Sequence, residues 1–232
     1  MSTLLITATD TAAGKTVLTT ALLAYWQTYY SSRSIGVMKL IQSGVGDREL
    51  YQELFTLDQS LETINPLYFQ APLAPPIAAR QESQMVDLGK VWSALQKLQH
   101  QRELVLAEAL GGLGCPVTAE LTVADLARDW QLPAVLVVPV KLGAIGQVVA
   151  HVALAQHMKV KLLGIVLNCV HPCSDQEVEN WAPTSLIQSL TQTPVLGLLP
   201  HLDNPQDVAQ LTQGAANLDL ELLLPLQFAP SR

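Results

Sequence analysis

The feature that most constrains this chain is the triplet Gly14, Lys15 and Thr16, which lies between an apolar run and an apolar helical stripe. Residues 4–7 form a short apolar run typical of a buried strand, and the apolar residues of 18–25 recur on one helix face. Such a triplet at a strand-to-helix turn is typical of a phosphate-binding loop, because backbone N–H groups of the loop and the helix start point at the phosphates. We therefore expect Lys15 near the β- and γ-phosphates and the Thr16 hydroxyl on Mg²⁺.

The loop departs from the usual phosphate-binding pattern at its first position. That pattern places a glycine five residues before Gly14, where this chain has Thr9, and the preceding Ala8 is not glycine either. The alternative is a helix start that carries the triplet without binding a ligand. The strand-to-helix context favours the phosphate loop.

Composition limits the class of protein and of partner. The chain has 232 residues, 49% of them apolar, which is enough for one α/β domain over residues 1–232 with a large core. With a net charge of −7 and no basic run, we expect no nucleic-acid partner, and no apolar stretch approaches the 18 residues of a membrane span. The N-terminus lacks the shape of a signal peptide and the cysteine count of 3 is odd, so we expect a cytoplasmic location.

Short apolar runs are expected to end at five residues, the polar Lys39, Glu108, Lys141 and Asn168, and Pro200. Short apolar strands that alternate with helices predict a mostly parallel sheet flanked by helices, hence a single-domain, three-layer P-loop fold of the α/β class. In such sheets, ligands bind beyond the carboxyl ends of the strands. All five residues are therefore expected on the same rim as the phosphate loop.

Three further helices are expected over residues 47–55, 86–99 and 148–158, where apolar residues recur with helical spacing or an acidic residue stands at the start. Residues 65–80 are rich in proline and are expected to form a surface loop within the domain, because the strand and helix pattern resumes after them.

These motifs together resemble those of the dethiobiotin synthetase family over nearly the whole chain. They occur in the family's order: Thr9-Asp10-Thr11-x-x-Gly14-Lys15-Thr16, Lys39-x-x-x-Ser43-Gly44, a proline-rich stretch from Asn65 to Pro75, Glu108-x-x-Gly111-Gly112, Lys141-Leu142-Gly143, and Asn168. No single motif is decisive, but six motifs in this order are specific.

The chain departs from the family's motifs at three places. Ala8 replaces a usual glycine, and Ala109 and Leu110 replace the Gly-Ala pair that follows the family's glutamate. Gly146 stands where some members carry an asparagine that helps to bind the substrate carboxylate. The first two departures bear on loop geometry, and the third bears on how that carboxylate is held.

The resemblance implies an enzyme of biotin biosynthesis, a dethiobiotin synthase, which is an ATP-dependent cyclo-ligase. In the family's reaction, CO₂ forms a carbamate on one amine of 7,8-diaminopelargonate, and the carbamate attacks the γ-phosphate of ATP. The second amine of the resulting carbamic-phosphoric anhydride then closes the ureido ring. The resemblance also implies Mg²⁺, ATP as co-substrate, and a homodimer that binds the diamine between its subunits.

The resemblance also assigns roles to residues. The catalytic residues would be Thr11, Lys15 and Lys39, and the Mg²⁺ ligands would be Thr16, Asp47 and Glu108, with Glu49 as the alternative to Asp47. Lys39 is our choice for the cation beside the carbamate, because a positive charge would hold that anion and oppose loss of CO₂. The diamine would contact Lys39, Ser43, Leu142 and Gly143, and the segment from Lys141 onwards would form the dimer face.

The expected nucleotide-binding residues lie in the loop, after Glu108 and at two later strand ends. They are Ala12, Ala13, Gly14, Lys15, Thr16, Val17, Asp47, Glu108, Ala109, Leu110, Gly111, Asn168, Cys169, Pro200, His201, Leu202 and Gln206. Asn168 is expected to read adenine, because one amide can donate to N7 and accept from N6 of that base.

Three other classes of protein remain as alternatives. Partitioning and cell-division ATPases of this fold carry a lysine five residues before the loop lysine, where this chain has Asp10. Amidoligases that act on a corrinoid precursor are normally longer, with a glutaminase domain that we do not find in this sequence. A non-enzymatic nucleotide-binding module is the third class, and the retained Lys39, Asp47 and Glu108 favour an enzyme over it.

Overall fold

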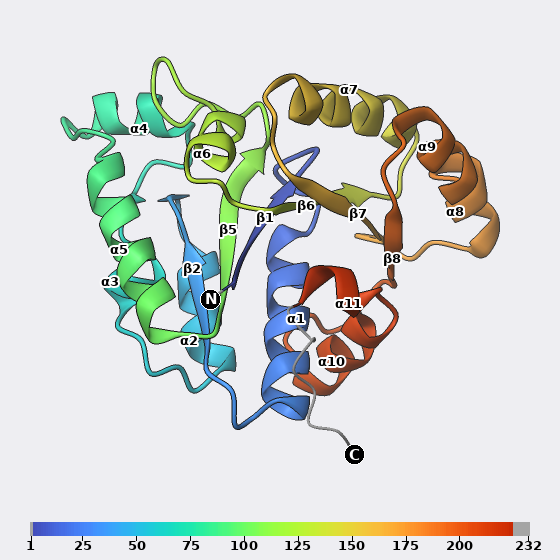
Figure 1. The fold of residues 1–232 in the computed structure, drawn as a ribbon, viewed down its shortest axis with the longest axis horizontal. Coiled ribbons are helices and arrows are strands. Elements are labelled where there is room, and N and C mark those ends of the chain that lie inside the picture. Colours follow the sequence, from blue (N-terminus) through green and yellow to red (C-terminus); the bar gives the residue numbers. More distant parts are fainter. Residues whose placement is uncertain (1, 225–232) are drawn as a thin grey trace.

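The computed structural model describes residues 2–224, and a six-stranded parallel sheet forms its centre, with the strand order β2-β5-β1-β6-β7-β8 (Figure 1). The strands are β1 (Ser2–Ala8), β2 (Ile35–Lys39), β5 (Leu104–Gly112), β6 (Ala134–Pro139), β7 (Leu162–Asn168) and β8 (Val195–Leu199). A separate pair of short parallel strands, β3 (Gln42–Ser43) and β4 (Tyr68–Phe69), lies outside this sheet. The parallel α/β architecture is confirmed. Residue 1 and residues 225–232, which the single-domain prediction includes, lie outside the described residues.

Helices cover both faces of the sheet, as the three-layer prediction requires (Figure 1). One face carries α1 (Lys15–Tyr29), α2 (Asp47–Leu54), α3 (Leu61–Ile64), α10 (Val208–Ala216) and α11 (Leu220–Leu223). The other carries α4 (Pro75–Gln81), α5 (Leu88–Gln101), α6 (Val123–Asp129), α7 (Ala144–His157), α8 (Asp175–Trp181) and α9 (Thr184–Thr191). Within residues 2–224, we find no helix with both the length and the apolar character needed to cross a bilayer.

Side chains of the central strand alternate between the two apolar cores. In β1, Leu4 and Ile6 pack into the core beneath α1, whereas Leu5 packs into the core on the opposite face. This alternation follows from the pleat of a strand, in which successive side chains point to opposite faces. A strand that is buried on both faces must be apolar throughout, which explains the continuous apolar run at the start of the chain.

Two segments differ from the sequence prediction. The proline-rich stretch contains β4 and α4, because Pro75 and Pro76 occupy the first positions of the helix, where a missing N–H breaks no intrahelical bond. Glu108, which we expected at a strand end, lies inside β5, since that strand continues to Gly112 and its pairing with β1 becomes irregular after Ile6.

The predicted rim is confirmed for the strands that carry it. Lys39 is the last residue of β2 and the register partner of Glu108, and Asn168 is the last residue of β7. Lys141 and Pro200 follow the last residues of β6 and β8. Because all these strands are parallel, their carboxyl ends lie on the edge of the sheet where β1 enters the phosphate loop.

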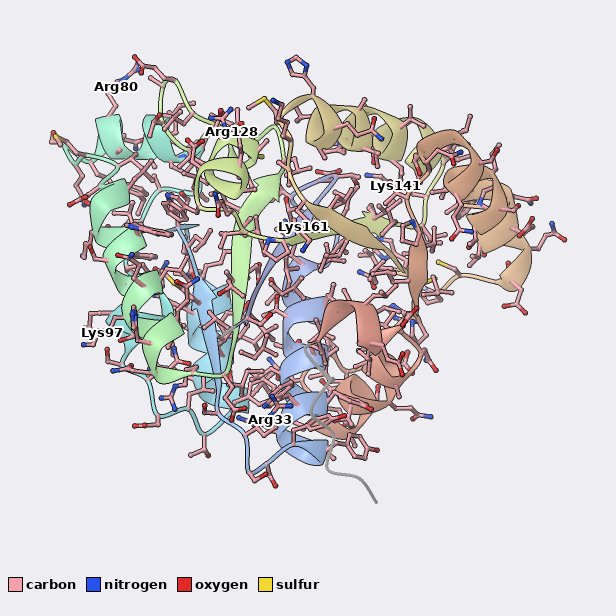
Figure 2. All side chains as sticks on the ribbon, in the orientation of Figure 1. Arg33, Arg80, Lys97, Arg128, Lys141 and Lys161 are labelled. Atoms are coloured by element: carbon pink, nitrogen blue, oxygen red, sulfur yellow. The ribbon has the colours of Figure 1, made fainter. Side chains whose placement is uncertain are left out.

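Basic side chains at the surface lie at separate places. The six that Figure 2 labels come from three different helices and three loops and do not gather into a common patch. They are Arg33, Arg80, Lys97, Arg128, Lys141 and Lys161.

Leu22 of α1 is fully buried in the core beneath that helix and tests how α1 packs against the sheet. We expect Leu22→Ala to lower the free energy of unfolding by about 2–5 kcal/mol, because the substitution leaves a cavity in a close-packed core. Urea unfolding followed by circular dichroism measures this change. Leu222→Ala is the control, at a leucine of α11 that is 50% exposed. Equal losses in the two variants would contradict the packing described for α1.

Candidate active site

The phosphate loop requires glycine at position 14 for two separate reasons. Gly14 caps α1 with φ = 92°, in the left-handed region that residues with a Cβ avoid. A Cβ there would also lie 1.9 Å from Nδ2 of Asn168. That amide nitrogen donates a hydrogen bond of 2.9 Å to the carbonyl oxygen of Ala13, so the end of β7 is tied directly to the loop.

The Lys15 side chain is held against the loop that precedes it. Its ammonium donates to the carbonyl oxygens of Asp10 at 3.2 Å and Thr11 at 3.1 Å, and the residue is only 4% exposed. Burial lowers the pKa of Lys15, and the negative charge of Glu108 partly opposes that effect. A buried cation whose partners are carbonyls carries a charge that phosphate oxygens can neutralise.

Asp10 closes the other side of the loop by pairing with Lys141, which follows β6. The Lys141 ammonium lies 2.9 Å from Oδ2 of Asp10, while Oδ1 accepts a hydrogen bond of 2.7 Å from the Thr11 N–H. The hydrogen bond from Lys141 and that from Thr11 together lower the pKa of Asp10. The loop is therefore held between two strand ends, that of β6 through this pair and that of β7 through Asn168.

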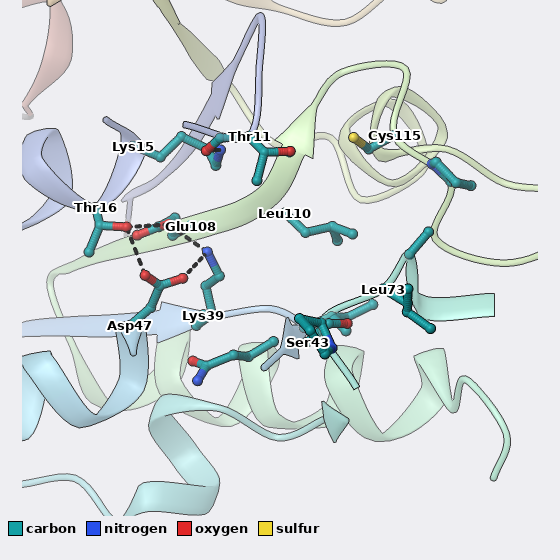
Figure 3. A pocket seen from close by; sticks show the side chains of 16 residues that line it. Thr11, Lys15, Thr16, Lys39, Ser43, Asp47, Leu73, Glu108, Leu110 and Cys115 are labelled. Atoms are coloured by element: carbon teal, nitrogen blue, oxygen red, sulfur yellow. Dashed lines mark hydrogen bonds and ion pairs between the residues drawn. The ribbon is translucent and has the colours of Figure 1, made fainter. Parts of the chain in front are cut away.

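Four side chains form a closed ring beside the loop, from β2, β5, α1 and α2 (Figure 3). The Lys39 ammonium lies 2.6 Å from Oδ2 of Asp47 and 2.5 Å from Oε1 of Glu108. The Thr16 hydroxyl lies 3.0 Å from Oδ1 of Asp47 and 3.0 Å from Oε1 of Glu108. Burial alone would lower the pKa of Lys39, but the charges of Glu108 and Asp47 outweigh burial and raise it.

The register of the sheet explains why Lys39 and Glu108 meet. They are partners on adjacent parallel strands, so both side chains point to the same face, the one that α1 and α2 cover. Asp47 begins α2 and reaches the ring from above that face. Glu49 does not reach it, because its carboxylate accepts hydrogen bonds from the side chain of Gln42 and the N–H of Gly46.

Glu108 is completely buried, with an exposure of 0%, and two further hydroxyls satisfy its second oxygen. Oε2 accepts a hydrogen bond of 3.2 Å from Thr19 and another from the hydroxyl of Tyr51. Burial and the charge of Glu108 raise the pKa of Tyr51 well above its usual value, so its hydroxyl stays protonated. Neither residue was predicted from the sequence, although each follows a predicted ligand by one helical turn, Thr19 after Thr16 and Tyr51 after Asp47.

The oxygens of this ring fit Mg²⁺. One hydroxyl and two carboxylates, from Thr16, Asp47 and Glu108, converge on the phosphate loop, and Mg²⁺ is usually held by one or two carboxylates together with waters and phosphate oxygens. The part of the chain that the structure describes contains no cluster of three or more His, Cys, Asp or Glu side chains suited to a metal. One hydroxyl and two carboxylates suit an ion that shares its coordination with a nucleotide.

A pocket of about 420 Å³ opens beside the ring and contains both polar and apolar surface (Figure 3). Its polar part includes the ring, Thr11, Lys15 and Ser43, and the hydroxyl of Ser43 is buried without a hydrogen-bond partner. Leu110 and Gly111, both predicted, line it as well. Residues that were not predicted supply the rest, namely Ile41, Gln42, Pro72, Leu73, Ala74, Cys115 and Pro116.

The remaining predicted nucleotide residues lie around the loop and at the ends of β7 and β8. Ala12, Ala13 and Val17 belong to the loop and the first turn of α1, and the carbonyl of Ala109 accepts a hydrogen bond of 3.3 Å from Lys39. Cys169 is bonded through its N–H to Leu199, and His201 contacts the carbonyl of Val170 through Nδ1 at 3.1 Å. The segment after β8 also contains Pro200, Leu202 and Gln206. The pocket is not lined by these three residues, by Cys169 or by His201.

Leu142 and Gly143 also lie outside the pocket. Leu142 is 83% exposed, and Gly143 caps α7 with φ = 91°. Of the four residues that were predicted to contact the diamine, Lys39 and Ser43 therefore line the pocket, and Leu142 and Gly143 do not.

Comparisons with known proteins bear on the family and the fold of this chain. A family model described as an AAA domain matches residues 2–208. The chain is 58% identical over 226 residues to the "ATP-dependent dethiobiotin synthetase BioD" of Gloeothece citriformis, covering 97% of this chain and 100% of that protein. It is 56% identical over 223 residues to the protein of the same name from Crocosphaera subtropica, covering 96% and 100%.

Among solved structures, the septum site-determining protein MinD of Pyrococcus horikoshii, complexed with Mg-ADP, matches with a TM-score of 0.59 over 98% of this chain and 96% of that one. At 14% identity, this likeness concerns the P-loop fold alone. The two curated relatives share more than half of their residues with this chain along nearly its full length. The chain therefore belongs to the ATP-dependent dethiobiotin synthetase family.

Proposed function

We propose that the protein is a dethiobiotin synthetase, which uses ATP to join CO₂ to 7,8-diaminopelargonate and close the ureido ring in biotin biosynthesis. The observation that carries this proposal is the position of Lys39. Its ammonium lies between the ring beside the phosphate loop and the pocket, whose lining is partly apolar. The reaction is inferred from membership of the family. The geometry of the site offers groups that suit the charged species of this reaction, the carbamate and the phosphates.

Phosphoryl transfer in this site depends on positioning and charge. It needs in-line reactants and neutralised oxygens, not a covalent protein intermediate. Lys15 and the N–H groups of the loop bind the β- and γ-phosphates. Thr16, Asp47 and Glu108 would hold Mg²⁺, which supplies positive charge to the phosphate oxygens.

Lys39 stabilises the carbamate and the phosphoryl group that moves to it. Its ammonium is held at the edge of the pocket by ion pairs with both Asp47 and Glu108. The free hydroxyl of Ser43 donates to the carbamate or accepts from an amine, and Thr11 lies across the pocket beside the loop. The methylene chain of the diamine lies against the apolar wall that includes Leu73 and Leu110.

A homodimer would complete the diamine site. Leu142 projects into solvent at the start of α7, and α7 and α9 expose further apolar residues, namely Val149, Leu186 and Leu190. If this surface is the dimer interface, Leu142 and Gly143 of one subunit approach the pocket of the other. That arrangement would explain why these two residues do not line the pocket of their own chain.

A regulatory ATPase of the same fold is less consistent with this site. In those ATPases a lysine stands at the position of Asp10, whereas here Asp10 is an anion paired with Lys141. The three free cysteines, which lie in the described part of the chain, suit the reducing cytoplasm in which we place the enzyme.

The activity itself is the first test. We expect the protein, incubated with 7,8-diaminopelargonate, bicarbonate, MgCl₂ and ATP, to form dethiobiotin together with equal amounts of ADP and phosphate, measured by mass spectrometry and phosphate release. Omission of the diamine should abolish phosphate release. Phosphate release that is independent of the diamine, without dethiobiotin, would instead favour the regulatory ATPase.

Lys39 and Lys15 should separate catalysis from nucleotide binding. We expect Lys39→Ala to lower kcat about 100-fold, because one lost stabilising charge in a transition state typically costs about 10²–10³ in rate. Lys39→Gln should be no faster, since the charge is what is missing. Calorimetry should give both variants a nearly normal affinity for Mg-ATP, whereas Lys15→Ala should bind it more weakly.

The matched control for these lysines is Lys97→Ala, at an exposed position of α5 that is remote from the site. It should leave kcat and affinity unchanged. A kcat for Lys39→Ala within about threefold of wild type at saturating bicarbonate, a difference of about 0.6 kcal/mol, would show that Lys39 has no catalytic role.

The dimer proposal predicts that light scattering at micromolar protein gives twice the mass of one chain. Leu142→Asp should reduce that mass or raise the KM for the diamine, because it places a charge in an apolar interface beside the shared site. Met85→Asp is the control, at another apolar residue that is more than four-fifths exposed, 81%. A monomer that turns over substrate at the normal rate would rule out the shared site.

A further inference from the structure

The two oxygens of the Glu108 carboxylate face different groups. Oε1 is directed to the ring, where it contacts the Lys39 ammonium and the Thr16 hydroxyl. Oε2 is directed into the protein, where it accepts from the hydroxyl of Tyr51 and from that of Thr19, which also lies 2.9 Å from the carbonyl oxygen of Lys15. One oxygen therefore meets the cationic side of the site, and the other meets only neutral donors.

This division has a physical consequence for a carboxylate that is 0% exposed. Without water, its oxygens require protein donors, and an unmet oxygen would turn toward whatever donor is in reach. Two neutral hydroxyls satisfy Oε2 without adding charge, so they fix the rotation of the carboxylate and leave the full attraction for cations at Oε1. A group that bound Oε2 with a positive charge would instead weaken the site for Mg²⁺.

The two hydroxyls come from the same helices that supply the inner ligands. In α1, Thr19 lies one turn after Thr16, and in α2, Tyr51 lies one turn after Asp47. Residues three or four apart share a helix face, so each helix presents one oxygen to the ring and one donor to the far side of Glu108. The placement of Glu108 is thus fixed from both helices at once.

We propose that Tyr51 and Thr19 are positioning residues of this active site, which hold Oε2 of Glu108 so that Oε1 faces the cation site. The inference rests on the proposed function for the identity of the cation, Mg²⁺ bound with a nucleotide. The carboxylate then offers one oxygen to the metal, and its second oxygen stays with the protein. Loss of either hydroxyl frees the carboxylate to rotate and weakens the cation site without touching the nucleotide.

Single hydroxyl deletions test this assignment through Mg²⁺ affinity, not through turnover. In Tyr51→Phe and Thr19→Val, we expect the apparent Kd for Mg²⁺, measured calorimetrically at saturating ADP, to rise about 10-fold, the lower end of what a lost partner of a metal ligand typically costs. The affinity for ADP without Mg²⁺ should stay near that of wild type. Thr19→Ser, which restores the hydroxyl, should return the Kd for Mg²⁺ to within about threefold of wild type, a difference of about 0.6 kcal/mol.

Matched controls separate this role from the packing of the same side chains. Thr20→Val removes the next hydroxyl of α1, which is also buried but bonds only to the backbone carbonyls of Thr16 and Val17. Tyr25→Phe removes a tyrosine hydroxyl from α1, at a half-buried residue outside the site. Both controls should bind Mg²⁺ as wild type does, and thermal unfolding of all variants reports any general loss of stability.

The outcomes are distinct. Equal Mg²⁺ affinity in Tyr51→Phe, Thr19→Val and the controls would overturn the positioning role and leave these residues as packing only. If Tyr51→Phe does not fold, the pair Thr19→Val and Thr19→Ser decides by itself. Wild-type protein that binds Mg-ADP but makes no dethiobiotin would overturn the proposed function alone, because Mg²⁺ binding is measured separately from the reaction.

Discussion

The buried charge of Glu108 is the constraint on which the rest of the site depends. A carboxylate removed from water is costly by several kcal/mol unless cations and hydrogen-bond donors replace the solvent. Here four groups do so, from Lys39 on β2, Thr16 and Thr19 on α1, and Tyr51 on α2. Glu108 therefore holds β5, its neighbour β2 and the helices α1 and α2 in one relative position.

The sequence was sufficient to predict the parts of this site that follow from regular geometry. Parallel strands bring their carboxyl ends to one rim, so Lys39 and Asn168 could be placed beside the phosphate loop without any knowledge of contacts. Glu108 was assigned to the correct rim but to the wrong place in its strand, because the strand was expected to end at this residue. Instead β5 continues to Gly112, and its pairing with β1 loses its regular register there.

The residues that sequence reasoning missed are those whose position depends on tertiary packing. Tyr51 looks like any apolar residue on the buried face of a helix, and only its hydroxyl contact reveals its role. Pro72 and Leu73 reach the pocket because β3 pairs with β4 and α4 begins at Pro75, inside a stretch that composition alone describes as a loop. Propensity carries no signal for such a contact, since it depends on which distant strand the segment meets.

The same sheet serves cell-division ATPases and this chain alike, so the framework of strands cannot decide between them. The difference in function must lie in the side chains at the carboxyl ends of the strands.

In this chain Lys39 and Glu108 are register partners, which places a cation and a carboxylate side by side on the face covered by α1 and α2. A pocket with an apolar wall then opens directly beside that cation, and Asp10 is paired with Lys141. An enzyme that must hold a small anion made from CO₂ next to a phosphate needs a lysine at such a border, whereas an ATPase that transfers phosphate only to water does not. We therefore propose that the residue that ends β2 distinguishes the chemistry, and the sheet register fixes where that residue points.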